Sequence, residues 1–358
     1  MKILNLPGVG GITTFDKPVR PESDPLGRWQ SRWGHGCQVI KPEFRVMKYR
    51  SGPSVQKRSN KNLSGYFVFR ENKETTINSV EAVWTIPNCY PPRDPLDGNW
   101  YTASTWIGID GDGQHGDMSA DILQVGVDSD VMKFGGTTTR WVNAWTQWVP
   151  GPTVWIPNFP VAPGDTLDAV IAMKKGKDSM TKSTIYLCNR TSGAATSFEV
   201  TAPKGTKLRG NCAEWIVEKC ELDGDPPSLA SYGAVCFDET KAFTDDGKEI
   251  ELEPSGKFYE MTSADQEIVS RAHFRGPKLV RCVYNGPTTT DLLLSKFVTP
   301  RGARPKLFTQ NDAKELKARE DELNAQIDSG KKTLGSLKET LKNARKLRVR
   351  HYGARCGV

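Results

Sequence analysis

Two short runs of sequence decide how this chain folds, ILQVGVD at residues 122–128 and AEWIVE at residues 213–218. Successive side chains of a strand point to opposite faces of a sheet, so Gln124 and Asp128 share one face while the leucine and the two valines share the other. By the same alternation Trp215 and Val217 face a core, and Glu214 points away from it. A carboxylate and a carboxamide on one face suit hydrolysis, in which one activates water and the other stabilises an oxyanion.

The region from about residue 62 to 300 contains further short segments of this kind, separated by Gly, Pro, Asn and Asp. No long stretch with the helical period of 3.6 residues interrupts them. We therefore predict an all-β fold, an antiparallel β-sandwich. The expected strands are residues 66–70, 79–86, 104–109, 122–128, 140–148, 166–173, 183–187, 197–201, 213–218, 231–237 and 279–284.

Charge divides the 358 residues into three parts. Residues 1–75 carry 14 Lys and Arg against 6 Asp and Glu, and residues 301–358 carry 15 against 7, which leaves 20 against 29 for residues 76–300. The net charge of +7 therefore belongs to the two ends, so the acidic core is not expected to bind nucleic acid, although either end could contact phosphate. The predicted organisation is a basic arm at 1–60, a sandwich domain at 61–300 and a basic helical tail at 301–358.

Four blocks in a fixed order resemble the glutamic peptidases, or eqolisins, a family named for its catalytic Glu and Gln. The blocks are TWIGIDG at 105–111, ILQVGVD at 122–128, NAWTQW at 143–148 and AEWIVE at 213–218. Four ordered blocks over roughly 110 residues are far more specific than one motif. The resemblance extends more loosely from about Asn62 to Tyr284, and the first and last sixty residues lie outside it.

The resemblance implies two curved antiparallel sheets of the concanavalin type, with the site on the concave face. It implies that Glu214 is the general base and that Gln124 holds the water and stabilises the oxyanion, with no metal, cofactor or covalent intermediate. Trp106, Asp110 and Trp145 match positions that line or support the substrate cleft. We expect the two catalytic side chains on neighbouring strands, in one solvent-accessible groove, acting on a protein or peptide substrate at acidic pH.

This chain departs from the family pattern at Asn143 and Gln147, where the family commonly shows acidic residues. Fewer carboxylates would raise the optimal pH or accompany a loss of activity. The alternative functions are a carbohydrate-binding or glucan-hydrolysing sandwich and an inactive scaffold. A glycosidase would need two carboxyl groups across a cleft, such as Glu214 with Glu218 or Asp128.

The two ends of the chain receive separate predictions. The N-terminal arm lacks periodicity, which predicts an irregular, propeptide-like segment. Its positive charge predicts that it masks the acidic body and leaves it at low pH. Lys57-Arg58 is the predicted processing point. The spacing of apolar residues between positions 311 and 350 predicts a helix. It is either solvated or a coiled coil for self-association, and the pattern leaves both open. Its regularly spaced apolar residues are Leu316, Leu323, Ile327, Leu334, Leu337 and Leu341.

Other chemistries find little support in the sequence. The four histidines have no metal-binding spacing, and no Gly-x-Ser-x-Gly motif occurs. The acidic run from Asp110 to Asp117 lacks the turn glycine and final glutamate of a calcium loop. Eight cysteines without a Cys-x-x-Cys pair leave disulfides open. No apolar stretch reaches membrane-spanning length and no clear signal peptide is visible, although the resemblance implies a secreted protein.

Overall fold

The computed structural model describes residues 2–5, 8–15, 37–47, 50–51, 62–92, 95–96, 98–112, 121–222, 228–263 and 267–286. The chain divides into two compact units, one made of Met1–Tyr90, Tyr101–Asp130 and Arg140–Gly286, the other of Pro91–Trp100, Val131–Thr139 and Pro287–Val358. The predicted C-terminal helix, the Lys57-Arg58 pair and most of the calcium-like loop lie outside the described residues.

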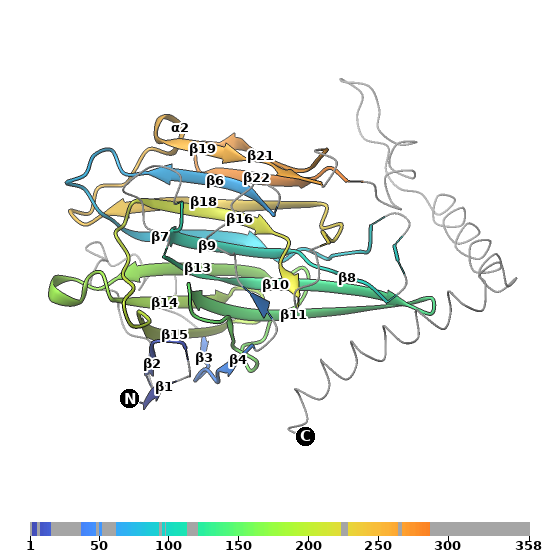
Figure 1. Ribbon diagram of the computed structural model, residues 1–358, viewed down its shortest axis with the longest axis horizontal. Coiled ribbons are helices and arrows are strands. Elements are labelled where there is room, and N and C mark those ends of the chain that lie inside the picture. The colour runs from blue at the N-terminus through green and yellow to red at the C-terminus, as the bar shows by residue number, and fades with distance from the viewer. Residues whose placement is uncertain are drawn as a thin grey trace, which may run out of the picture. The chain divides into compact units, whose positions relative to one another are not determined.

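Two large sheets, antiparallel except where β3 joins one of them, form most of the first unit (Figure 1). In the described residues the larger one has eleven strands, and we call it sheet A. Its order is β1 (Lys2–Asn5), β2 (Gly11–Thr14), β15 (Ala194–Thr201), β14 (Lys182–Asn189), β13 (Thr166–Met173), β7 (Ile77–Thr85), β18 (Ala234–Thr244), β22 (Leu279–Tyr284), β21 (Ile268–Gly276) and β20 (Met261–Thr262), with β3 (Gln38–Val39) also on β15.

The second sheet, sheet B, carries both of the runs that open the sequence analysis. Its order is β19 (Gly256–Tyr259), β6 (Leu63–Phe69), β16 (Cys212–Glu218), β9 (Ser104–Asp110), β10 (Ile122–Phe134), β11 (Thr137–Trp148), β12 (Val154–Trp155) and β4 (Arg45–Val46). Strand β8 (Trp100–Tyr101) also belongs to sheet B, where it pairs with β10. The remaining elements are the short pair of β5 (Arg50–Ser51) and β17 (Glu221–Leu222), the 3-10 turn η1 (Gly176–Asp178) and the helical turn α2 (Leu252–Ser255).

The core between the sheets is built by the apolar face that the alternation predicted. Two indoles cross it: Trp215 Nε1 of β16 donates to the carbonyl of Glu81 at 3.0 Å, and Trp84 Nε1 of β7 donates to Thr105 Oγ1 at 3.0 Å. Both rings are fully buried. Burying about 200 Å² of such a ring contributes about 5 kcal/mol at about 25 cal/mol per Å². The all-β sandwich is therefore confirmed, and Glu214 lies on the opposite face of sheet B from this core.

All eleven predicted strands overlap observed ones. The differences lie at the ends, because β10 and β11 continue into a long hairpin and β18 extends to Thr244. Strand β21 was missed because the run IVSRAHFRG does not alternate strictly between apolar and polar residues. In the second unit, the hairpin turns at Gly135 and Gly136, both with positive φ.

The prediction of an irregular N-terminal arm is wrong for the residues that the structure describes. Strands β1 and β2 form a hairpin that extends sheet A beyond β15, and β3 runs parallel to β15. Seven residues later β4 pairs with β12 and so lies at the edge of sheet B. Residues 37–47 therefore join the edges of both sheets. Short strands of this kind carry no periodicity, because the open sheet edges, and not the segment's own pattern, decide their conformation.

Candidate active site

Gln124 and Glu214 lie on one face of sheet B, on either side of the same residue. Gln124 of β10 and Glu214 of β16 are both register partners of Gly108 in the intervening strand β9. The expectation of neighbouring strands is therefore wrong by one strand. Strands lie about 4.8 Å apart, so the two Cα atoms are separated by about 9.6 Å, a gap that two long side chains can bridge through one water.

Gly108 makes this arrangement sterically feasible. A Cβ atom at this position would lie 2.9 Å from Glu214 Oε1, 2.9 Å from Trp106 Cζ3 and 3.2 Å from Glu214 Cγ. The Glu214 side chain therefore lies directly over the glycine. Any larger residue at position 108 would compete with this carboxylate for space.

A second glutamine holds the Gln124 carboxamide in place. Gln124 Nε2 donates to Gln147 Oε1 of β11 at 3.0 Å, and Gln147 Nε2 donates to the carbonyl of Gly151 at 2.8 Å. Because the Gln147 amide group is held by that carbonyl, its oxygen faces Gln124 and can only accept. Within the described residues, Gln124 Oε1 is buried and has no hydrogen-bond partner. One N–H and the oxygen of Gln124 are thus available to a substrate or water.

Both candidate catalytic side chains are fully buried, with 0% exposure for Gln124 and for Glu214. The expectation of a solvent-accessible groove is therefore wrong for this conformation. Met47, next to β4, packs against the hydrophobic cluster on this face.

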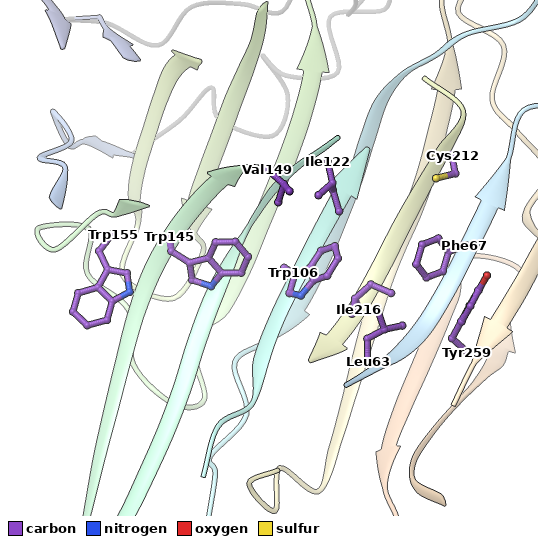
Figure 2. Packing of buried hydrophobic residues seen from close by; sticks show 10 residues of the cluster. All are labelled: Leu63, Phe67, Trp106, Ile122, Trp145, Val149, Trp155, Cys212, Ile216 and Tyr259. Carbon is purple, nitrogen blue, oxygen red and sulfur yellow. The ribbon is translucent and has the colours of Figure 1, made fainter. Parts of the chain in front are cut away.

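That hydrophobic cluster runs across sheet B around the two polar side chains. Figure 2 shows the indoles of Trp155, Trp145 and Trp106 following one another across β12, β11 and β9, with the side chains of β16, β6 and β19 beyond them. Trp106 and Trp145, the predicted substrate-binding residues, are 1% and 3% exposed. The structure places both beside the Gln124 and Glu214 pair, and their contact with substrate stays a prediction.

A second polar row lies four residues further along the same three strands. Asp128 and Glu218 are the register partners of Ser104, as Gln124 and Glu214 are of Gly108. Here the intervening residue has a side chain, and Ser104 Oγ donates to Asp128 Oδ1 at 2.7 Å.

Indole N–H groups donate further hydrogen bonds to this row. Trp155 Nε1 donates to Asp128 Oδ2 at 3.3 Å, and Trp106 Nε1 donates to Glu218 Oε2 at 3.1 Å. Trp145 Nε1 donates to the oxygen of Ser104 at 3.1 Å. The second row is thus a structural network that orients the three indoles of the cluster.

Asp110 acts on the backbone of the loop that leads into β16. It ends β9 with φ at 65°, a left-handed conformation that costs a non-glycine residue about 1 kcal/mol or more. Its carboxylate accepts N–H groups of Arg209 at 2.5 Å, Gly210 at 3.1 Å and Asn211 at 2.6 Å. Burial raises the pKa of Asp110 to about 6, although these donors favour the ionised form. These contacts position the strand that carries Glu214, and a contact of Asp110 with substrate stays a prediction.

Further titratable groups lie at the same end of sheet B. Tyr259 of β19 donates its hydroxyl to Asp112 Oδ2 at 2.9 Å. Burial raises the pKa of the Cys212 thiol, and the charges of Glu214, Asp110 and Asp112 raise it further. Burial and the Asp112 hydrogen bond likewise raise the pKa of Tyr259. The Glu214 carboxylate thus lies in a region of low dielectric and negative charge.

The sequence interpretation assigned no role to Gly108, Ser104 or Tyr259, and it named Gln147 only as a departure from the acidic residues of the family. The first two could have been found by aligning β9 with its neighbours, since Gly108 lies four residues from Ser104 as Gln124 does from Asp128. Tyr259 carries no local signal. In the described residues no group of three His, Cys, Asp or Glu side chains is arranged to hold a metal ion. In the same part of the chain no helix is long and apolar enough to cross a membrane.

Comparison with known proteins identifies relatives. Aspergillopepsin-2 from Aspergillus niger is 28% identical over 178 residues, which cover 48% of this chain and 58% of that protein's length. A structure of scytalido-glutamic peptidase with a transition state analogue inhibitor has 23% identity and a TM-score of 0.49, covering 63% of this chain and 98% of that one. Aspergilloglutamic peptidase from Aspergillus niger has 23% identity and a TM-score of 0.43, covering 51% and 99%. The model of the Peptidase A4 family matches residues 61–284, more than half of the chain, so this chain belongs to the Peptidase A4 family, the glutamic peptidases or eqolisins.

Proposed function

We propose that this chain is a glutamic endopeptidase that hydrolyses peptide bonds with Glu214 and Gln124 and that the described conformation is its closed form. The observation that carries the proposal is the placement of both side chains across Gly108 on one face of sheet B. A carboxylate and a carboxamide facing each other over a glycine supply a base and an oxyanion donor without a third group.

In this proposal a water lies between the two side chains, above Gly108. Glu214 takes a proton from the water, whose oxygen attacks the carbonyl carbon of the peptide. The free N–H of Gln124 donates to the oxyanion that forms, while its other N–H stays bonded to Gln147. Glu214 then returns the proton to the departing amine, so that the water is divided between the two products. Removal of a single oxyanion donor costs about 3 kcal/mol in comparable enzymes.

The proposal includes an acidic working pH. The leaving amine needs a proton, and four nearly inaccessible carboxyl groups lie on this face of sheet B: Asp110, Asp128, Glu214 and Glu218. Protonating those that do not act as the base relieves their mutual repulsion. The base itself must stay ionised, so activity should fall again at the lowest pH values. Secretion, which the resemblance implied, belongs to the same proposal.

The glycosidase alternative is poorly supported by the same geometry. Its second carboxyl would be Asp128 or Glu218. Asp128 accepts hydrogen bonds from Ser104 and Trp155, and Glu218 accepts one from Trp106. A general acid must instead present a proton to the leaving oxygen of the sugar. The peptidase proposal uses the row in which the intervening residue is a glycine, where a reacting group can approach.

The test is hydrolysis of a denatured protein substrate between pH 2 and 7 by the wild type and by Glu214→Gln, Gln124→Ala and the double variant. Each single change should abolish hydrolysis and leave the fold intact, and the double variant should be little worse because both groups act on one water. Glu218→Gln serves as the matched control, a carboxylate on the same strand and face that is predicted to keep the chemistry. Near-wild-type turnover in either single variant would refute the assignment.

A further inference from the structure

Two cysteines that are distant in sequence lie together where the N-terminal segment meets sheet A. Cys37, directly before β3, places its Sγ 3.9 Å from Sγ of Cys188 in β14, although 151 positions separate them. Cys37 is partly exposed and Cys188 is buried. This contact brings the N-terminal segment and the body of the sandwich within reach of a covalent link.

The backbone on both sides of this contact is held by hydrogen bonds. Gln38 N donates to the carbonyl of Gly193 at 2.8 Å, and Ile40 N donates to that of Ala195 at 2.7 Å. The turn after Cys188 is closed by the bond from Gly193 N to the carbonyl of Asn189 at 2.8 Å. A disulfide needs an S–S distance of about 2.05 Å, so the sulfur atoms must approach by about 1.9 Å. Rotation of the two side chains can share this shift while the strands stay in place.

We propose that Cys37 and Cys188 form a disulfide that ties the N-terminal segment to sheet A. Two further described cysteines of sheet A, Cys236 and Cys282, are not placed to form a competing bond. Cys236 and Cys282, on paired strands, are offset by one residue in register, since Cys282 opposes Val235 and Cys236 opposes Arg281. Their side chains therefore point to opposite faces of sheet A.

The bond forms by exchange with a small disulfide such as oxidised glutathione. The thiolate of Cys37, the more exposed of the two, attacks one glutathione sulfur, giving a mixed disulfide and one released glutathione thiol. Cys188 then attacks the Cys37 sulfur and releases the second thiol, so two protein thiols and one glutathione disulfide become one protein disulfide and two glutathione thiols. Burial raises the pKa of Cys188 to about 12, which makes the second step the slower one.

The disulfide would change the result of a cut in the chain. A cleavage between residues 52 and 61, for instance at Lys57-Arg58, would leave the N-terminal fragment attached to the body until the bond is reduced. Strands β1 to β4 would then stay in both sheets after processing. This inference does not depend on peptidase activity, because it concerns only the two thiols and the strands that hold them.

The test uses the full chain equilibrated at about pH 8 in mixtures of oxidised and reduced glutathione, then alkylated and digested with trypsin. Oxidising mixtures should yield the peptide of residues 33–45, WGHGCQVIKPEFR, linked to that of residues 183–190, STIYLCNR, and reduction should separate them. In the oxidising mixtures, the thiols of Cys37 and Cys188 should not be alkylated. Alkylation of both cysteines without a linked peptide, or linkage of Cys37 to another cysteine, would overturn the proposal.

Unfolding in denaturant gives a second measurement. Oxidation should raise the denaturant midpoint of the wild type, because a cross-link over so long a loop restricts the unfolded chain. The midpoints of Cys37→Ser and Cys188→Ser should not respond to oxidation. Cys236→Ser, which removes an exposed thiol outside the contact, should keep the wild-type response. An equal response in Cys37→Ser would contradict the assignment.

Discussion

Gly108→Ala tests the geometry of the site through a single methyl group. The new Cβ would lie 2.9 Å from Glu214 Oε1 and 2.9 Å from Trp106 Cζ3. Contacts below 3.0 Å force a shift. The Trp106 indole is held by its hydrogen bond to Glu218, so the end of the Glu214 side chain should be displaced. The substitution therefore moves the proposed base without removing any charge.

The expected effect on catalysis is larger than the effect on stability. Ordinary contact begins near 3.4 Å, so relief of the clash moves the carboxylate by roughly 0.5–1 Å. A misplacement of about 1 Å in a reacting group costs about 100-fold in rate, equivalent to about 2.7 kcal/mol. Overpacking by one methyl group in a tight site costs about 1–3 kcal/mol of folding free energy. The variant should fold, with a lower melting temperature and a kcat/KM reduced by about two orders of magnitude.

The assay compares kcat/KM on one peptide substrate with the thermal unfolding curve of each protein. Gly276→Ala is the matched control, since it adds a methyl group to a strand glycine whose Cβ would have no heavy atom within 4 Å. It should keep wild-type activity and near wild-type stability. A folded Gly108→Ala protein with unchanged kcat/KM would refute the reasoning, because the space above Gly108 would then not be where Glu214 acts.

Three more predictions follow from the contacts of the site and of the N-terminal segment. Asp110→Asn should lower the free energy of unfolding by about 3 kcal/mol, because an amide cannot accept all three backbone N–H groups. Burial raises the pKa of Asp110 from 3.8 to about 6, so between about pH 4 and 6 the folded wild type keeps a proton that its unfolded chain releases. The stability advantage of the wild type over Asp110→Asn should therefore shrink as pH rises through this range. Denaturant unfolding at pH 4 and 7 measures this, and an equal advantage at both would contradict it. Gln147→Glu should confine activity to lower pH, since an ionised carboxylate cannot donate to the Gly151 carbonyl; superimposable pH–rate profiles would argue against the role of Gln147. Deleting residues 1–47 should lower the denaturant midpoint by exposing the edges of β15 and β12. In the full-length chain, the amides of Gln38, Ile40 and Met47 should stay protected from hydrogen exchange at pH 4, because backbone hydrogen bonds between strands do not titrate. A truncated protein that is as stable as the full chain would exclude this structural role.

The sequence alone determined the sandwich and the face on which its polar residues lie. Alternation with period two is a local property, so it can be read from each strand without knowledge of its neighbours. It placed Trp215 toward the core and Glu214 away from it, as the hydrogen bond from Trp215 to β7 confirms. The ordered motifs identified the family for the same reason, since each motif is a continuous run of residues.

Only the tertiary structure decided how the strands combine into a site. Register is set by packing between strands, and it placed Gln124 and Glu214 on either side of Gly108 instead of on adjacent strands. Burial depends on the whole chain, so the local pattern could not show that both side chains are covered. The strands of the N-terminal segment form because sheet edges offer unpaired N–H and C=O groups, and those edges exist only after the rest of the chain has folded.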